Sequence, residues 1–239
     1  MANISRQELK SDEFVSGVDA AFEFYLQHQK QILTILVIVV VVVASAYGVY
    51  AWNHSRTQKA EAALSTGLDR LHAPILAKGQ TAPPGVETFA SAQDRARAAQ
   101  EQFEKVIADY GSTRAGKIAR YYLGLTQVEL QQTSQAESTL QQASQSGGAV
   151  QPLAQNALAN LYISEGKAEQ ARPILEALIK QNSPAVPKAV AMTELAEMEK
   201  TSDPAAAARL YQQLSQDYPN TPTGQQAEQA LASLPKPAR

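Results

Sequence analysis

The chain has 239 residues, of which 44% are hydrophobic and 18% charged, with a formal net charge of −2 and no cysteine. This length predicts one or two domains, and the composition excludes collagen-like, disulfide-scaffolded and fully disordered proteins. Without cysteine the chain can form no disulfide, thiolate nucleophile or Cys-ligated zinc site. Alanine and glutamine, both good helix formers, supply more than a quarter of the residues, so an all-α protein is expected.

The first 31 residues carry five acidic and three basic side chains. Within them the apolar residues Phe14, Val18, Phe22 and Tyr25 follow helical spacing. This pattern predicts a short amphipathic helix. Such a helix either lies on a surface or simply continues into the apolar run that begins at Ile32.

Residues 32–52 form a run of 21 residues without a charge. At a rise of about 1.5 Å per residue, a helix of this length crosses a hydrocarbon core of about 30 Å. The run is rich in valine, but a single strand cannot satisfy its backbone groups in lipid, so a transmembrane helix is predicted. Ala44 and Gly48 lie four residues apart in it and form a small-xxx-small pair that could contact a partner helix in the membrane.

A cleaved signal peptide is the alternative for this run, because Ala44-Ser45-Ala46 resembles a cleavage site. The long acidic segment before the run argues against it, since signal peptides begin with a short basic region.

Lys30 precedes the run, whereas Arg56 and Lys59 follow it. The positive-inside rule therefore leans against a cytoplasmic N-terminus, and charge alone leaves the orientation open.

Residues 53–239 contain 18 basic and 18 acidic side chains, so no basic surface for nucleic acid is expected. His28, His54 and His72 are too widely separated to form one metal site readily. No nucleotide-binding or hydrolase motif occurs. Neither an enzyme nor a cofactor site is expected.

A repeat of 35 to 37 residues runs through the second half of the chain, marked by Ala99, Ala136, Ala171 and Ala207. A large apolar residue follows each alanine after four positions, and a further apolar residue follows after seven. These residues are Phe103 and Val106, Leu140 and Ala143, Leu175 and Leu178, and Tyr211 and Leu214. The offsets describe one buried helix face, and the period is that of stacked helix pairs. The markers Leu123-Gly124, Leu158-Ala159 and Leu195-Ala196 precede three of the alanines and indicate the first helix of each pair.

These positions resemble those of the tetratricopeptide repeat, although the tryptophan at its start is missing and alanine replaces glycine in the later repeats. The resemblance implies an α-solenoid over residues 53–239. We expect one helix pair over about residues 56–109, interrupted by a proline-rich loop at 78–85. Three regular pairs come next, and a last helix from Thr223 to Leu234 caps the stack.

The order of an acidic start, one span and a repeat domain resembles the YfgM-like family of ancillary subunits of the SecYEG translocon. That resemblance implies a single-pass protein of the bacterial inner membrane, with residues 1–31 in the cytoplasm, 32–52 in the lipid and 53–239 in the periplasm. Its implied partners are the translocon, periplasmic chaperones or unfolded clients. The segment from Phe103 to Tyr110 is also similar to repeats of cell-division coordinators and outer-membrane assembly proteins, so a structural scaffold of the envelope is the alternative. The oligomeric state stays open.

In repeats of this type the first helix of each pair lines the concave side of the stack. This implies a protein-binding groove, for which the candidate residues are Tyr121, Leu125, Asn156, Asn160 and Ile163. Ile118 and Val128 fall on the same side but are expected to pack within the stack. Asn156 and Asn160, at positions i and i+4, share one helix face and could bond the backbone of an extended peptide. These positions lack lysine, so binding that tolerates salt is expected rather than a clamp for carboxylates.

Overall fold

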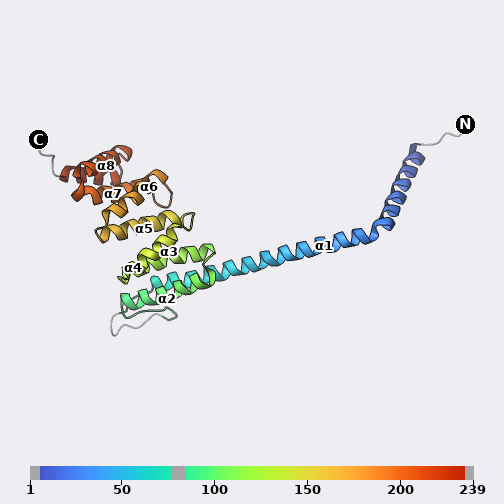
Figure 1. The fold of residues 1–239 in the computed structure, drawn as a ribbon, viewed down its shortest axis with the longest axis horizontal. Coiled ribbons are helices and arrows are strands. Elements are labelled where there is room, and N and C mark those ends of the chain that lie inside the picture. The colour runs from blue at the N-terminus through green and yellow to red at the C-terminus, as the bar shows by residue number, and fades with distance from the viewer. Residues whose placement is uncertain (1–5, 77–83, 235–239) are drawn as a thin grey trace. The chain divides into compact units, whose positions relative to one another are not determined.

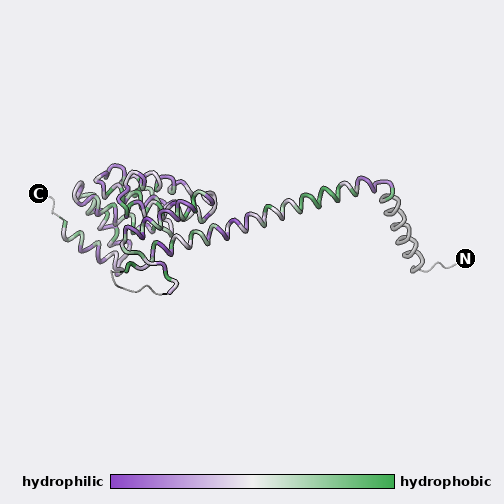
Figure 2. Tube along the Cα trace, turned by 90° about the horizontal axis from the view of Figure 1, so that it is seen from below, coloured by the Kyte–Doolittle hydropathy of each residue, from purple (hydrophilic) through white to green (hydrophobic). Residues whose placement is uncertain are grey.

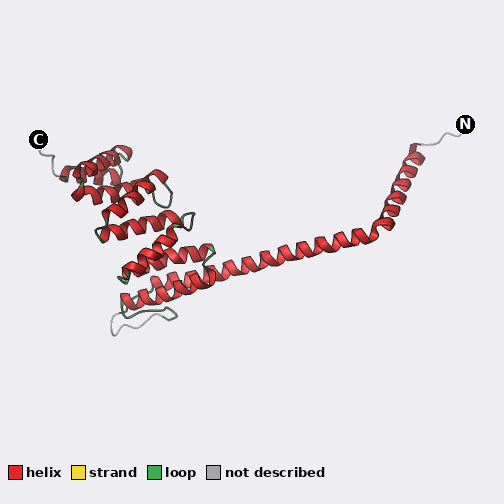
Figure 3. Ribbon diagram, in the orientation of Figure 1, coloured by secondary structure: helices red, strands yellow, loops and turns green. Residues whose placement is uncertain are grey.

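The computed structural model describes residues 6–76 and 84–234, with side chains described from Leu26 onward except that of Ile32. Regular structure in these ranges is α-helical, and they contain no β-strand (Figure 3). The chain divides into two units, Met1–Ser55 and Arg56–Arg239. The predicted all-α class is confirmed.

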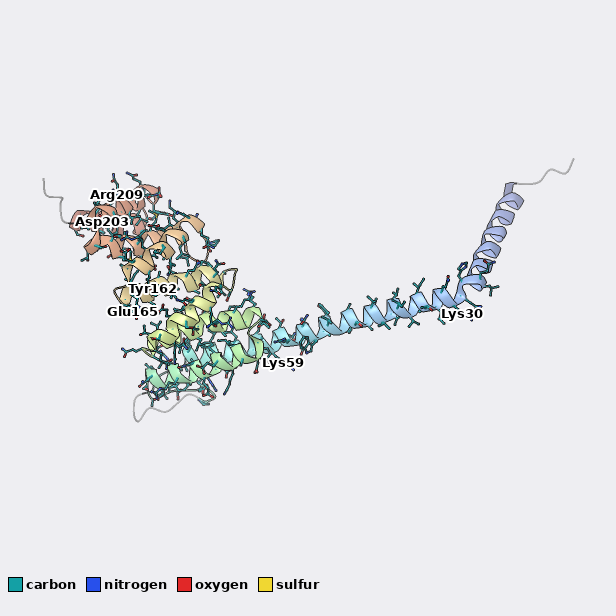
Figure 4. All side chains as sticks on the ribbon, in the orientation of Figure 1. Lys30, Lys59, Tyr162, Glu165, Asp203 and Arg209 are labelled. Atoms are coloured by element: carbon teal, nitrogen blue, oxygen red, sulfur yellow. The ribbon has the colours of Figure 1, made fainter. Side chains whose placement is uncertain are left out.

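The first unit holds most of helix α1, which is Arg6–Leu71. Its apolar run is exposed on all sides, with 53–62% of each residue from Ile35 to Val43 accessible. Figure 2 shows this run as a green stretch, and Figure 4 labels Lys30 before it and Lys59 after it. A helix that is apolar all round needs a non-aqueous environment, and this one is long and apolar enough to cross a membrane. The residues expected to form an amphipathic face at 14–25 are helical, but their side chains lie outside the described residues.

The second unit is a stack of helices that each pack against the next (Figure 1). It begins with the last turns of α1, from Arg56 to Leu71. The following helices are α2 (Ala92–Tyr110), α3 (Arg114–Glu129), α4 (Thr133–Ser144), α5 (Val150–Ser164), α6 (Ala168–Gln181), α7 (Lys188–Ser202), α8 (Pro204–Asp217) and α9 (Pro222–Ser233). These bounds agree with the predicted order of one interrupted pair, three regular pairs and a final helix.

The repeat register predicted from the alanines is the buried face of α2, α4, α6 and α8. Each of the four alanines is fully buried. The large apolar residues four positions later are also buried, with at most 1% of Phe103, Leu140, Leu175 or Tyr211 exposed. These side chains fall into successive clusters along the stack, so each helix pair buries its apolar face against its neighbours.

The first pair consists of the end of α1 and α2. Ala60 and Leu64 are buried with Phe103, and a Cβ built on Gly67 would come within 2.6 Å of the Phe103 ring. The helices are also joined by a hydrogen bond, since Gln102 Nε2 donates to the carbonyl of Ala63 at 3.1 Å. Glycine at position 67 therefore lets α1 approach α2 closely enough to form the first layer of the stack.

Two backbone hydrogen bonds join the beginning and the end of the connection between α1 and α2. The backbone N–H of Leu76 donates to Phe89 and that of Phe89 donates to Pro74, at 2.9 and 3.1 Å. Arg70 Nε lies 3.1 Å from Glu87 Oε2. Most of the predicted proline-rich loop at 78–85 lies outside the described residues.

Two of the turns between helix pairs use the same local sequence, Asp-Tyr-x-x-Thr-x-x-Gly. In the first, Thr113 caps α3 by accepting the N–H of Gly116 at 3.1 Å and donates to the carbonyl of Tyr110 at 2.7 Å. Thr221 makes the equivalent bonds to Gly224 and Tyr218 at the start of α9. A threonine cap thus turns the chain sharply from one pair into the next helix.

Candidate protein-interaction groove

Four of the five predicted groove residues line one cavity between α3 and α5. The cavity has a volume of about 320 Å³, and its lining includes Tyr121, Leu125, Asn156 and Asn160. Val128, expected within the stack, is 39% exposed and lines the same cavity. Ile163 of α5 was predicted to line the groove as well. It is not part of this lining, because it packs against the buried core cluster.

Glu194 of α7 holds the two asparagines. Its Oε1 accepts a hydrogen bond from Asn156 Nδ2 at 3.1 Å and another from Asn160 Nδ2 at 3.3 Å. The other carboxylate oxygen, Oε2, and Asn156 Oδ1 are shielded from solvent and accept no hydrogen bond within the described part of the chain. One N–H of each amide is therefore engaged within the stack, and the two shielded oxygens are not open to a ligand.

Glu194 is not among the residues predicted from the sequence, although a signal for it exists. It immediately precedes the marker Leu195-Ala196, so it belongs to the first helix of the next pair. The two hydrogen bonds show that residues of the consecutive first helices α5 and α7 meet here. Searching each such helix for a partner of the preceding one would have found this contact.

A second cavity, of about 710 Å³, shares Tyr121 and Leu153 with the first. Ile118 and Tyr122 line it as well, as do the cationic residues Arg114 and Lys117 from the first turns of α3. Together the two cavities form one surface along α3 and α5, which we call the α3–α5 groove. The groove positions predicted from the sequence begin at Ile118 and contain no lysine. Lys117, one residue earlier, also lines the groove, so the expectation that the groove lacks lysine is wrong.

The loop between α4 and α5 closes over this second cavity. Lys117 Nζ donates to the carbonyl of Ser146 at 2.9 Å. Gly147 and Gly148 come next with φ of 72° and 63°, a backbone conformation that favours glycine. The loop leads into α5, whose N-cap residue Ala149 has no side chain that can accept the free N–H groups of the first turn.

Tyr121 occupies the middle of the groove. Its ring meets that of Tyr122 edge to face, with 5.3 Å between the centroids, and Tyr122 stacks on Phe103 at 5.8 Å. Burial, with a smaller contribution from Tyr122, raises the pKa of Tyr121 above its ordinary value. The phenol therefore stays neutral at physiological pH and can act as a hydrogen-bond donor beside an apolar surface.

Ala44 and Gly48, the predicted contact for a partner helix, lie on the exposed apolar run of α1. A Cβ built on Gly48 would meet no atom within 4 Å. Their spacing of four residues puts them on one face of the helix. Small residues at this spacing let helices approach closely in membranes, so the pair stays a prediction for a helix contact.

Polar clusters outside the groove have structural explanations. Glu199 of α7 is 1% exposed and forms an ion pair with Arg172 of α6, while Ser202 donates to its second oxygen at 2.9 Å. Within the part of the chain whose side chains are described, no group of three or more His, Asp or Glu residues could hold a metal ion. Among the three histidines that were expected to lie apart, His72 contacts the carbonyl oxygen of Leu68 through its ring Nδ1 at 2.8 Å.

Comparison with protein families found a match to the tetratricopeptide repeat-like domain over residues 23–185. The matched range is more than half of the chain and includes both the apolar run and the α3–α5 groove. Comparison with curated proteins and with solved structures gave no match. This fold is typically a scaffold for protein interaction rather than a catalyst. The chain belongs to the tetratricopeptide repeat-like domain family.

Proposed function

We propose that this protein is a membrane-anchored protein-interaction module of the bacterial envelope, and that it works beside the protein translocon as an ancillary subunit. Residues 32–52 anchor it in the inner membrane, residues 1–31 lie in the cytoplasm and residues 53–239 in the periplasm. It binds translocon subunits, periplasmic chaperones or unfolded clients, and it has no catalytic role.

One observation carries this proposal: a single helix, α1, supplies both the exposed apolar run and the first layer of the repeat stack. Valines 39–43 are more than half exposed, whereas Ala60 and Leu64 of the same helix are buried against α2. Lipid is the environment that would cover the first group. The family match from residue 23 also includes the apolar run, which supports a retained anchor rather than a cleaved leader.

The repeat domain supports the interaction role through the α3–α5 groove. Tyr121 and Leu153 provide an apolar centre, and the groove has polar groups on both sides of it. Tyrosine in such a position contributes much contact area for little loss of side-chain freedom. A concave surface of this kind suits extended polypeptide segments.

The anchor and orientation are tested with an N-terminal tag on the full-length protein. The tag should remain with the protein in membranes, and protease added to spheroplasts should digest residues 53–239. A soluble product beginning near Tyr47 would exclude the anchor. Protection of the C-terminal domain, with digestion after permeabilisation, would reverse the orientation.

The partners are tested by crosslinking in native membranes. Three forms are compared: the wild type, a triple variant with Tyr121, Asn156 and Asn160 changed to alanine, and Gly48→Leu. Loss of translocon neighbours in Gly48→Leu alone would assign docking to the membrane helix and leave the groove for clients. Neighbours drawn solely from division or outer-membrane machinery would favour the scaffold alternative.

A further inference from the structure

We propose that the α3–α5 groove selects extended peptide segments in which acidic side chains stand next to aromatic or aliphatic ones. This inference rests on the proposed function, because it names the class of segment that the interaction module binds. Three parts of the groove support it: a cationic end, an apolar centre and a polar end lined by Asn156 and Asn160.

The cationic end consists of Arg114 and Lys117. Arg114 is exposed and forms no ion pair within the described part of the chain, and the first turn of α3 contains no acidic residue. A helix N-terminus is itself positive and is usually flanked by Asp or Glu, so cations here add to the positive potential instead of cancelling it. Lys117 also donates to the carbonyl of Ser146, but no such bond accounts for Arg114, whose charge would complement an acidic segment.

The apolar centre adjoins these cations directly. Ile118 lies one turn from Arg114 on α3, and Tyr121 lies one turn from Lys117. Leu153 of α5 faces the same cavity. An aromatic or aliphatic side chain next to an acidic one could therefore reach Tyr121 and Leu153 while the carboxylate meets Arg114 or Lys117.

The far end offers a polar side chain to the backbone of the same segment. Asn160 lines the cavity and is exposed, and its side-chain oxygen can accept a peptide N–H. From Arg114 to Val128, α3 is about 21 Å long. An extended peptide covers that length with about six residues.

The experiment uses the full-length protein in lipid nanodiscs and three fluorescein-labelled peptides of equal length. The acidic probe is Gly-Asp-Glu-Phe-Leu-Ser-Gly. The neutral probe replaces its acids with Asn and Gln, and the basic probe replaces both with Lys. We expect fluorescence anisotropy at low salt to give about tenfold tighter binding of the acidic than of the basic probe, a preference that high salt reduces.

Arg114→Glu is the informative variant, and Arg97→Glu is its matched control. Both residues are exposed arginines, but Arg97 lies on α2 and does not line the groove. Arg114→Glu should abolish the preference for the acidic probe, whereas Arg97→Glu should keep it. Because an acid suits the first turn of α3, Arg114→Glu should melt at the wild-type temperature or above, so lost binding would not reflect unfolding.

Equal binding of the three probes by the wild type would overturn the inference while leaving the proposed function in place. Absence of peptide binding in a protein that keeps its crosslinked translocon neighbours would also overturn it. Loss of the preference in both arginine variants would assign it to overall charge rather than to the groove, and would equally contradict the proposal.

Discussion

Gly124 of α3 lies directly against Leu140 of α4: a Cβ built on residue 124 would come within 2.6 Å of Leu140 Cδ2 and 2.7 Å of its Cγ. Leu140 is fully buried and has little room to move away. The Gly67 and Phe103 contact between α1 and α2 has the same form. The small residue in the first helix therefore sets how closely the two helices of a pair approach.

Gly124→Ala should consequently destabilise the domain, although alanine is the better helix former. Its helix propensity gains about 1 kcal/mol, while overpacking against a buried leucine costs about 1–3 kcal/mol. Combining it with Leu140→Val should cost less than the sum of the single changes, because the shorter side chain makes room. Urea unfolding of the four proteins measures this coupling, and strictly additive free energies would contradict the contact.

The repeat register could be read from the sequence because spacing alone determines it. Alanines 99, 136, 171 and 207 and the apolar residues four and seven positions later share one helix face. The contact of Gly67 with Phe103 could not be found this way, because the long loop after α1 lengthens the first pair beyond the repeat period. The Asp-Tyr-x-x-Thr-x-x-Gly turns were present in the sequence as a repeated signal and could have located the starts of α3 and α9.

Leu175→Asp tests the register at the centre of the stack. Leu175 is fully buried in the core cluster around α5 and α6, so aspartate there would be an unpaired charge. We expect a loss of several kcal/mol, enough to unfold a domain of ordinary stability. Circular dichroism during heating measures it. Ala177→Asp on the exposed face of the same helix is the control, and equal melting of both variants would contradict the assigned face.

Tyr211 gives a prediction that depends on pH. It is 1% exposed and its hydroxyl donates to Glu197, and burial together with this hydrogen bond raises its pKa. The folded state therefore holds the phenolic proton more tightly than the unfolded state does. Its contribution to stability is complete below about pH 10, the ordinary tyrosine pKa, and falls as the pH rises above that value.

Tyr211→Phe removes both the hydrogen bond and this titration. At neutral pH it should lower the free energy of unfolding by about 1 kcal/mol. The difference between wild type and variant should shrink above about pH 10, because only the wild type loses the Tyr211 contribution there. Denaturant unfolding at about pH 7 to 11 measures it, and the other tyrosines cancel in the comparison. A constant difference across this range would contradict the assignment.

The groove was less predictable than the core. Counting along α3 and α5 selected Tyr121, Leu125, Asn156 and Asn160, which lie on first helices and line one cavity. Counting within single helices could not identify Glu194, whose role depends on the distance between α5 and α7. Nor could it include the cations at the start of α3, whose place in the lining depends on the course of the α4–α5 loop.

Glu194 should support the groove by holding the asparagines, and its replacement by alanine and by glutamine should have different effects. Glu194→Ala leaves the partly buried Asn156 Nδ2 without its acceptor, at a cost of about 1–3 kcal/mol, whereas the exposed Asn160 Nδ2 can bond water instead. Glu194→Gln keeps one carbonyl acceptor for the two amides, so it should lose much less.

Urea unfolding of the full-length protein in detergent compares these two variants with Glu176→Ala, which removes an exposed acid from α6. We expect Glu176→Ala to stay within about 0.5 kcal/mol of the wild type. If charge rather than hydrogen bonding mattered at Glu194, the alanine and glutamine variants would lose equal stability. That result would mean that a neutral hydrogen-bond acceptor at position 194 is not enough to hold the asparagines. A larger loss for alanine would establish Glu194 as the hydrogen-bond acceptor that positions Asn156 and Asn160 at the polar end of the groove.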